Sequence, residues 1–405
     1  MHQPLEALAR VRRAFGEHGG VNRSIEASTT FTVLEAGIMP EIFQGLRSPE
    51  TGGCYLYGRH FNPTVYALGR ELAALEGTEA AHCTASGMSA ISATLMQLCK
   101  PGDHIVASKV LYGGTYALLQ NYLPDRCQVR CTMVDVDDLA ALEAAFTPTT
   151  RVLYVETMSN PTLVIADLPR LAALAHRRGA LLVVDNTFCP LIVNPVQHGA
   201  DIVLHSLTKF ISGASDIIAG AVCGSQELIN SLMDVNHGGF MLLGPTMDPK
   251  VAFELSLRLP HLGLRIQEHS RRAQVFAERL HARGLSVIYP GLKTHAQHAL
   301  LQGMGNTEAY GAGGVFCVDM GDTASAFRLM NALQNLQDFG YIAVSLGYFD
   351  TLLSCSAVST SSEMPEAQQL SAGLSPGLVR ISIGYTGSLE QRWQQFDEAL
   401  QSLGL

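Results

Sequence analysis

Between about residue 79 and residue 224, short apolar segments alternate with longer segments whose apolar positions recur at helical spacing. Seven apolar segments predict strands: residues 80–84, 104–108, 129–135, 151–157, 180–187, 201–206 and 217–224. Between two of them, residues 167–178 place five apolar side chains on one helical face: Leu168, Leu171, Ala172, Leu174 and Ala175. Strands that are apolar on both faces and alternate with helices are typical of an α/β fold with a mostly parallel sheet.

The remaining parts of the chain follow different patterns. Residues 248–283 predict a helical region that Pro260 divides into two helices. Beyond it, strands are expected at 313–320, 341–345 and 378–383 and a helix at 323–336, which favours an α+β arrangement. The first 60 residues are rich in glycine, serine, threonine and proline, as in an extended arm. We therefore expect an arm at 1–61, a large domain at 62–250 and a smaller α+β domain at 251–405.

Composition narrows the class of protein. The 405 residues include 27 lysines and arginines against 36 aspartates and glutamates, a net charge of −9, which argues against a nucleic-acid partner. The apolar share of 47% and charged share of 16% fit a large buried core and exclude a disordered or fibrous protein. Nine cysteines among apolar neighbours are typical of reduced thiols. With no apolar run that resembles a secretory signal or a membrane span, we expect a cytoplasmic protein.

Polar residues cluster at the ends of the predicted strands, where ligands bind in open parallel sheets. Ser86, Gly87 and Met88 follow residues 80–84 and open a helix; such a start binds anions, although Ser86 is equally suited to a simple N-cap. Asp185 ends an apolar segment, where a carboxylate is costly unless it is paired or caps a turn. Residues 156–161 mark another strand end followed by a turn.

Lys209 is the most informative residue of these clusters. It follows Ser206 and Thr208 at a strand end and has the apolar neighbours Val203, Leu204, Phe210 and Ile211. A desolvated lysine has a lowered pKa and becomes a nucleophile towards carbonyl groups. A Schiff-base lysine, an upstream aspartate for a pyridinium nitrogen and a helix start for a phosphate together describe a site for pyridoxal 5′-phosphate.

On these motifs the chain resembles the trans-sulfuration group of pyridoxal-phosphate enzymes, the Cys/Met metabolism family. The stretch 201–220, with His205-Ser206-Leu207-Thr208-Lys209 and Gly213-Ala214-Ser215-Asp216, resembles the family signature, and the likeness extends from 57–64 to 379–384. The resemblance implies an aspartate-aminotransferase-like fold, fold type I of the PLP-dependent transferases. Its large domain holds the mostly parallel sheet, and its C-terminal domain is the smaller α+β unit.

The resemblance also implies roles for individual residues. Lys209 would hold the cofactor covalently and act as the base, Asp185 would keep the ring nitrogen protonated, and Tyr112 would stack on the ring and exchange protons. The remaining cofactor-binding residues would be Ser86, Gly87, Met88, Glu156, Asn160, Thr187, Ser206 and Thr208, joined by Tyr57 and Arg59 from a neighbouring subunit. Arg380 would bind the substrate carboxylate, as arginine suits a bidentate pair, with Ser345 and Leu346 beside it.

Within the family, residues 345–352, 359–362 and 241–247 are most similar to the methionine γ-lyases. This similarity implies γ-elimination of L-methionine, and of related sulfur amino acids such as homocysteine, to a thiol, 2-oxobutanoate and ammonia. Many methionine γ-lyases have a cysteine at the position of Gly114. Cystathionine γ-lyases and homoserine-ester sulfhydrylases have glycine there, as this chain does, so their activities are the alternatives.

Two further interpretations are weaker. A catalytically silent scaffold protein is disfavoured because Lys209, Asp185, Tyr112 and Arg380 are all present. His295 and His298 have no companion ligands at metal spacing, so we expect no metal site. The resemblance further implies a homo-oligomer with shared active sites, a tetramer built as a dimer of dimers.

Overall fold

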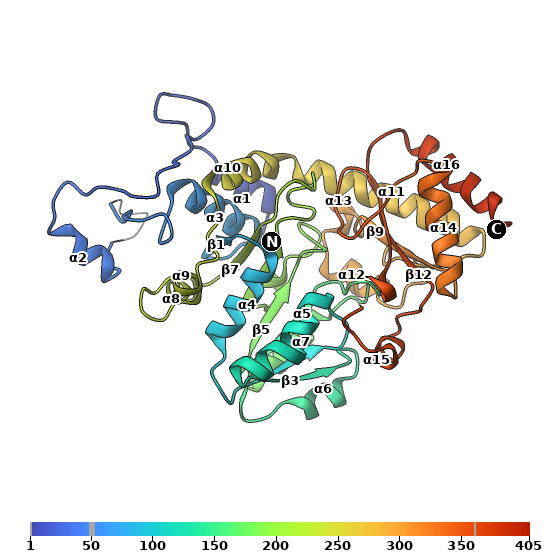
Figure 1. The fold of residues 1–405 in the computed structure, drawn as a ribbon, viewed down its shortest axis with the longest axis horizontal. Helices are drawn as coiled ribbons and strands as arrows, with labels where there is room; N and C mark the ends of the chain where they lie inside the picture. The colour runs from blue at the N-terminus through green and yellow to red at the C-terminus, as the bar shows by residue number, and fades with distance from the viewer. Residues whose placement is uncertain (1, 48–52, 360–361) are drawn as a thin grey trace.

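The computed structural model describes residues 2–47, 53–359 and 362–405. Two β-sheets form separate layers (Figure 1), one built from residues before 225 and the other from residues after 285. The long helix α11 (Leu262–Ala282) packs on strands β8 (Ser286–Ile288) and β9 (Val315–Asp319) of the second sheet.

The first sheet has the strand order β1-β7-β6-β5-β4-β2-β3. Its strands are β1 (Ala80–Thr84), β2 (His104–Ser108), β3 (Arg130–Val134), β4 (Thr150–Glu156), β5 (Leu181–Asp185), β6 (Ile202–Ser206) and β7 (Gly220–Gly224). Five neighbouring strands, β6, β5, β4, β2 and β3, pair in parallel. Strand β7 runs antiparallel to both β6 and β1. The prediction of a mostly parallel sheet is confirmed, with each of the seven predicted strands present.

Both faces of this sheet are covered. One face carries Val155, Val184 and Val203, which pack in the same core cluster as helices α3 and α7. The other face carries Tyr154 and Leu204 in a cluster with α4 and the π-helix η1. The helices of this half are α3 (Pro63–Glu76), α4 (Gly87–Leu98), α5 (Gly113–Ala117), η1 (Leu118–Cys127), α6 (Leu139–Ala145), α7 (Leu168–Arg177), η2 (Pro195–His198), α8 (Gln226–Leu232), α9 (Gly239–Leu243) and α10 (Pro249–Arg258). Burial on both sides explains why the strands are apolar throughout.

The second sheet has the order β10-β11-β12-β9-β8 and is antiparallel apart from the β10–β11 pair. Its remaining strands are β10 (Tyr341–Ile342), β11 (Leu352–Cys355) and β12 (Leu378–Ser382), and its remaining helices are η3 (Leu259–His261), α12 (His298–Met304), α13 (Thr307–Tyr310), α14 (Thr323–Asn335), η4 (Ser356–Val358), α15 (Glu366–Ser371) and α16 (Leu389–Ser402). The two predicted helices are α10 and α11, with Pro260 in the 3₁₀ turn between them.

The prediction of a strand at 341–345 is wrong for the second half of that range. Pairing stops at Ile342, and Ser345 has a φ of 106° and Gly347 a φ of 76°. A positive φ takes the backbone out of the extended region, so residues 343–347 form a loop rather than a strand end. This loop turns Ser345 and Leu346 towards the first sheet.

The segment that follows α1 and carries α2 extends away from the two sheets (Figure 1). Helix α1 (Pro4–Val11) packs against α3 and buries Leu8, whereas helix α2 (Ile38–Phe43) buries none of its residues. Among the described residues, no helix has the length and apolar character needed to cross a lipid bilayer.

Candidate active site

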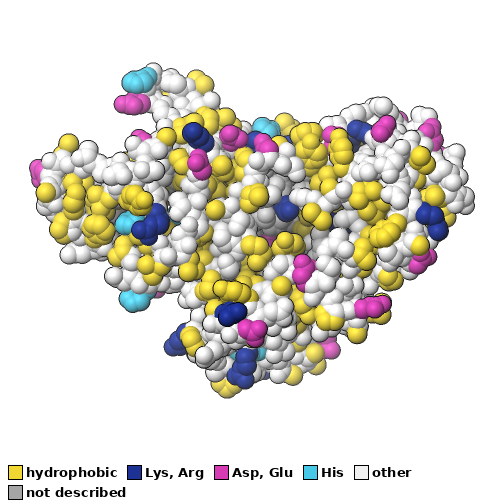
Figure 2. Space-filling view, viewed as in Figure 1, with side chains coloured by type: hydrophobic (Ala, Val, Ile, Leu, Met, Phe, Trp, Pro, Cys, Tyr) yellow, Lys and Arg dark blue, Asp and Glu magenta, His cyan; other side chains and the backbone are white. Residues whose placement is uncertain are grey.

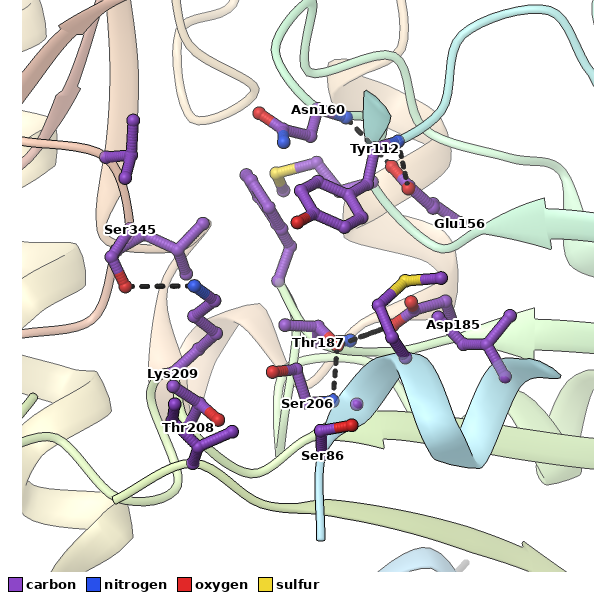
Figure 3. A pocket seen from close by; sticks show the side chains of 18 of the residues that line it. Ser86, Tyr112, Glu156, Asn160, Asp185, Thr187, Ser206, Thr208, Lys209 and Ser345 are labelled. Atoms are coloured by element: carbon purple, nitrogen blue, oxygen red, sulfur yellow. Dashed lines mark hydrogen bonds between the residues drawn. The ribbon is translucent and has the colours of Figure 1, made fainter. Parts of the chain in front are cut away.

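A cavity of about 430 Å³ opens at the carboxyl ends of β4, β5 and β6 and is closed on its far side by the loop 343–347 and β12 (Figure 3). Its lining contains nearly all of the site residues expected from the sequence: Ser86, Gly87, Met88, Tyr112, Glu156, Asn160, Asp185, Thr187, Ser206, Thr208, Lys209, Ser345, Leu346 and Arg380. The two sheets therefore supply opposite sides of one pocket.

Helix α4 begins at this cavity. Ser86 is its N-cap, and the Ser86 and Ser89 side chains satisfy each other's backbone N–H groups in a capping box. The cap interpretation of Ser86 is thus confirmed, and the helix start still faces the cavity. A Cβ on Gly87 would lie 2.8 Å from Ser206 Cβ, and one on Gly220 would lie 2.2 Å from the Ser86 carbonyl oxygen. Only glycine allows these backbone segments to approach so closely.

Asp185 lies at the end of β5 with its side chain directed into the cavity (Figure 3). Its Oδ1 accepts hydrogen bonds from the Thr187 backbone N–H (3.0 Å) and hydroxyl (2.5 Å). The Thr187 hydroxyl oxygen in turn accepts from the Ser206 N–H at 2.8 Å. Burial raises the pKa of Asp185, so a cationic group placed beside it would be strongly favoured in this pocket.

Glu156 lies beside Asp185 at the end of β4 and fixes two loops. Its carboxylate oxygens accept from the backbone N–H of Tyr112 (2.7 Å) and of Asn160 (2.9 Å). Burial, reinforced by the Asp185 carboxylate, raises the pKa of Glu156 above its usual range. Because its oxygens already bind backbone groups, this side chain positions Tyr112 and Asn160.

Lys209 follows β6 and extends towards the second sheet. Its Nζ donates to Ser345 Oγ at 2.9 Å (Figure 3). Burial, together with the positive charge of Arg380, lowers the pKa of Lys209 to about 8. A sizeable fraction of the side chain is therefore neutral near physiological pH, the form that attacks a carbonyl carbon or accepts a proton.

Arg380 is the largest of the fully buried side chains, with 2% exposure. It stands in the middle of β12, and its Nη1 donates to Asn160 Oδ1 and its Nη2 to the Ser345 carbonyl oxygen, both at 2.8 Å. Its Nε has no partner among the described residues, and burial lowers the Arg380 pKa to about 10. A buried guanidinium to which no carboxylate of the described residues is bonded is suited to an anionic ligand.

Tyr112 precedes α5 at the entrance of the cavity and is 41% exposed. Burial and the charge of Glu363 raise the pKa of Tyr112, which keeps the phenol protonated and able to donate. Thr208 contacts the loop before β7, since its Oγ1 accepts from the Ala219 N–H at 3.0 Å.

Some lining residues escaped the sequence analysis: Ile91, Met158, Phe188, Ile218, Val344, Ser359 and Glu363. Several follow from positions already identified, because Ile91 lies one helical turn after Gly87 and Phe188 follows Thr187 directly. Ser359 and Glu363 stand outside the strand-end clusters from which the other site residues were predicted.

Tyr57 and Arg59 do not line the cavity within the described chain. The Arg59 Nη1 donates to the Met241 carbonyl oxygen at 2.8 Å, and the guanidinium carbon lies 5.8 Å from the centre of the Tyr57 ring. Their expected role towards a neighbouring subunit stays a prediction.

Comparison with models of protein families gives the family that the sequence motifs resemble. A model of the family described as "Cys/Met metabolism PLP-dependent enzyme" matches residues 7–400. The chain belongs to this family. Dependence on pyridoxal phosphate and the fold type I architecture are thereby established.

Individual relatives agree with the family. The methionine gamma-lyase of Arabidopsis thaliana is 56% identical over 98% of this chain and 90% of its own length. The L-methionine gamma-lyase of Pseudomonas putida is 38% identical over 91% and 90%. A solved structure from Campylobacter jejuni, titled as a putative O-acetylhomoserine (thiol)-lyase with a pyridoxyl-lysine phosphate, matches with a TM-score of 0.88 and 25% identity over 98% of this chain and 99% of that one.

The pocket of this chain fits the family's cofactor. The close approach of Gly87 to Ser206 leaves the α4 N-terminus open to a phosphate. The buried Asp185 carboxylate suits a protonated ring nitrogen, and Lys209 has the lowered pKa that carbonyl attachment requires.

Proposed function

We propose that this enzyme cleaves L-methionine, and related sulfur amino acids such as homocysteine, by γ-elimination to methanethiol or the corresponding thiol, 2-oxobutanoate and ammonia. The 56% identity over nearly the whole chain to a plant methionine gamma-lyase is the observation that carries this proposal. The pocket supports it, since the cavity combines Arg380 with apolar lining residues such as Ile91, Met158 and Val344, which suit an uncharged thioether.

Arg380 and Asp185 bind the substrate and the cofactor, respectively. Arg380 binds the substrate carboxylate, and its ties to Asn160 and Ser345 fix the guanidinium plane. When bound, pyridoxal phosphate supplies an electron sink for the carbanions formed at Cα and Cβ. Asp185, at the end of β5, would hold the ring nitrogen and favour its protonated form.

Lys209 and Tyr112 move the protons. The Lys209 Nζ, neutral in part because of its lowered pKa, accepts the proton from Cα, and a second proton must leave Cβ before the sulfur departs from Cγ. The Tyr112 hydroxyl, with its raised pKa, donates a proton to the departing sulfur. Ser345 receives the hydrogen bond of Lys209 and keeps the amine near the reacting carbons.

A second candidate is γ-elimination from cystathionine or γ-replacement on a homoserine ester. Gly114 favours it, because the sequence resemblance places glycine at this position in both of those enzyme classes; an added Cβ here would lie 2.7 Å from Tyr112 Cε1. A pocket that differs by a methylene group discriminates by only about 1–3 kcal/mol, so the related substrates must be compared directly.

We further propose that the enzyme is a cytoplasmic homotetramer in which an arm, residues 1–61, completes a neighbour's site with Tyr57 and Arg59. Residues 62–250 would form the cofactor-binding domain and 251–405 the C-terminal domain. The exposure of apolar arm side chains such as Val21 and Leu34 supports the assembly.

The test is a direct assay of the holoenzyme with L-methionine, L-homocysteine and L-cystathionine at equal concentration. Release of methanethiol and 2-oxobutanoate from methionine, at a rate comparable to or above that for cystathionine, is the expected result. Cleavage of cystathionine with methionine nearly inert would overturn the proposal and favour the second candidate.

A further inference from the structure

A row of buried polar side chains lies directly behind the residues that line the cavity. Glu156, Asp185 and Leu204 stand opposite one another across β4, β5 and β6. The residue that follows each of these in the sequence is Thr157, Asn186 and His205, respectively, and these three are 0%, 0% and 1% exposed. Backbone bonds extend the ladder into this row, from Thr157 N to Asp185 O (3.0 Å) and from Asn186 N to Leu204 O (2.9 Å).

The side chains of this row are joined to one another and to helix α3. Thr157 Oγ1 donates to Asn186 Oδ1 at 2.9 Å, and Asn186 Nδ2 donates to Glu76 Oε1 at 3.3 Å. His205 Nε2 lies 2.6 Å from the same Glu76 oxygen. Glu76 is the last residue of α3 and is 2% exposed. A continuous hydrogen-bonded path therefore connects the ends of three strands with one helix end.

Packing alone does not require these residue types. Two residues earlier on the same strands, Val155, Val184 and Val203 form an apolar row within the core cluster that includes α3. Polar groups in such a place are costly to bury, and within the described residues Glu76 Oε2 and His205 Nδ1 have no partner. What hydrogen bonds add over apolar contacts is direction, because each bond fixes how the two groups that it joins are oriented.

Each of the three strand-end members of the network adjoins a residue of the cavity in sequence. Thr157 follows Glu156, Asn186 lies between Asp185 and Thr187, and His205 precedes Ser206. We propose that Glu76, His205, Asn186 and Thr157 are positioning residues, which fix the ends of β4, β5 and β6 so that Asp185 and Ser206 stand at the spacing the cofactor needs. This inference rests on the proposed roles of Asp185 and Ser206, and is independent of which amino acid is cleaved.

Strand β4 offers a matched control for this proposal. Thr157 follows its carboxyl end, and Thr150, 2% exposed, lies at its amino end. Thr150 Oγ1 also joins a buried cross-strand network, since it lies 2.8 Å from His104 Nδ1, and His104 Nε2 lies 2.9 Å from Thr132 Oγ1 of β3. Thr157→Val and Thr150→Val thus remove the same hydroxyl from opposite ends of one strand.

The experiment measures the affinity of each cofactor-free variant for pyridoxal phosphate by titration of the visible absorbance of the bound cofactor. An unpaired buried acceptor at Asn186 is expected to raise the Kd of Thr157→Val about tenfold, with Thr150→Val within about twofold of the wild type. The KM for the amino acid should change little in both, since Arg380 is untouched. Equal Kd changes in the two variants, or none in Thr157→Val, would overturn the proposal.

Glu76 provides a second pair of variants that decides the question if Thr157→Val does not fold. Glu76→Gln keeps an oxygen for Asn186 and His205 and should retain most of the cofactor affinity, whereas Glu76→Leu leaves both without an acceptor and should lose it. Similar Kd values for Gln and Leu would contradict a positioning role. A wild-type protein that binds the cofactor but does not cleave methionine would overturn the proposed function and leave this test intact.

Discussion

The cavity and the N-terminal arm differ in how far their side chains are exposed to solvent. Around the cavity, Arg380 and Asp185 are 2% and 9% exposed, and each has hydrogen-bond partners within the chain. In the arm, Val21 and Leu34 are 93% and 99% exposed, and hydrophobic side chains gather over the α2 side of the molecule (Figure 2). The cavity side chains are thus held by contacts within the chain, whereas the arm presents apolar surface of the kind that subunit contacts bury.

The largest expected effect is at Lys209. Lys209→Ala should lower kcat by about 10³-fold or more, because the variant has lost the group that accepts the Cα proton. Among the residues that the structure describes, its side chain makes one hydrogen bond, to Ser345, so the melting temperature and circular dichroism should stay close to the wild type. Lys250→Ala, at an exposed position on α10, is the control. Global unfolding of Lys209→Ala would instead make the lysine a structural residue.

Arg380→Ala should raise the KM for the amino acid at least about 30-fold, since truncating one partner of a buried charge pair costs about 2–5 kcal/mol. Steady-state kinetics at saturating pyridoxal phosphate measure this change, with the visible absorbance confirming that cofactor is bound. A KM equal to that of the wild type would remove Arg380 from the substrate site.

The arm provides the next prediction. Leu34→Glu should shift the sedimentation profile towards smaller species, because a carboxylate would be buried in a subunit contact. Leu336→Glu makes the same change at a position 67% exposed but outside the arm, and should leave the profile unchanged. If Leu34→Glu sediments as the wild type does, Leu34 lies outside any subunit contact.

A smaller effect is expected at Gly114. In Gly114→Ala the new Cβ would lie 2.7 Å from Tyr112 Cε1 and 3.3 Å from Met88 Sδ, so the Tyr112 ring must shift. We expect kcat to fall about tenfold, within the cost of displacing a catalytic group by a fraction of an ångström. Gly303→Ala, where an added Cβ has no neighbour within 4 Å, is the control. Unaltered kinetics would show that Tyr112 tolerates displacement.

The smallest effect is on stability. Lys209 has a pKa of about 8 when folded against a reference of 10.5, so between these values the unfolded state binds more protons and folding stability rises with pH. In cofactor-free protein, the wild type should therefore gain stability relative to Lys209→Met from pH 8 to pH 10. Thermal melts at several pH values give this difference, and a constant difference would mean that the lysine pKa is not lowered.

Local sequence signals were sufficient for much of the first sheet. Its seven strands and the α7 helix are where the apolar periodicity predicts them, since both faces of the sheet are buried and every strand must be apolar. Strands β8 and β11 were not predicted. They are short, and their pairing with β9 and β12 depends on residues distant in the chain.

In the candidate site, too, some features follow from local sequence and others from long-range packing. The sequence by itself indicated which candidate site residues stand at strand and helix ends, among them Lys209, Asp185 and Gly87, because the geometry of those ends is local. Only the tertiary structure decided that Arg380, on a different sheet, meets Asn160 and Ser345, and that Glu76 meets His205 and Asn186. These contacts join residues up to 220 positions apart, and such pairings follow from how the two sheets and α3 pack, which no local pattern specifies.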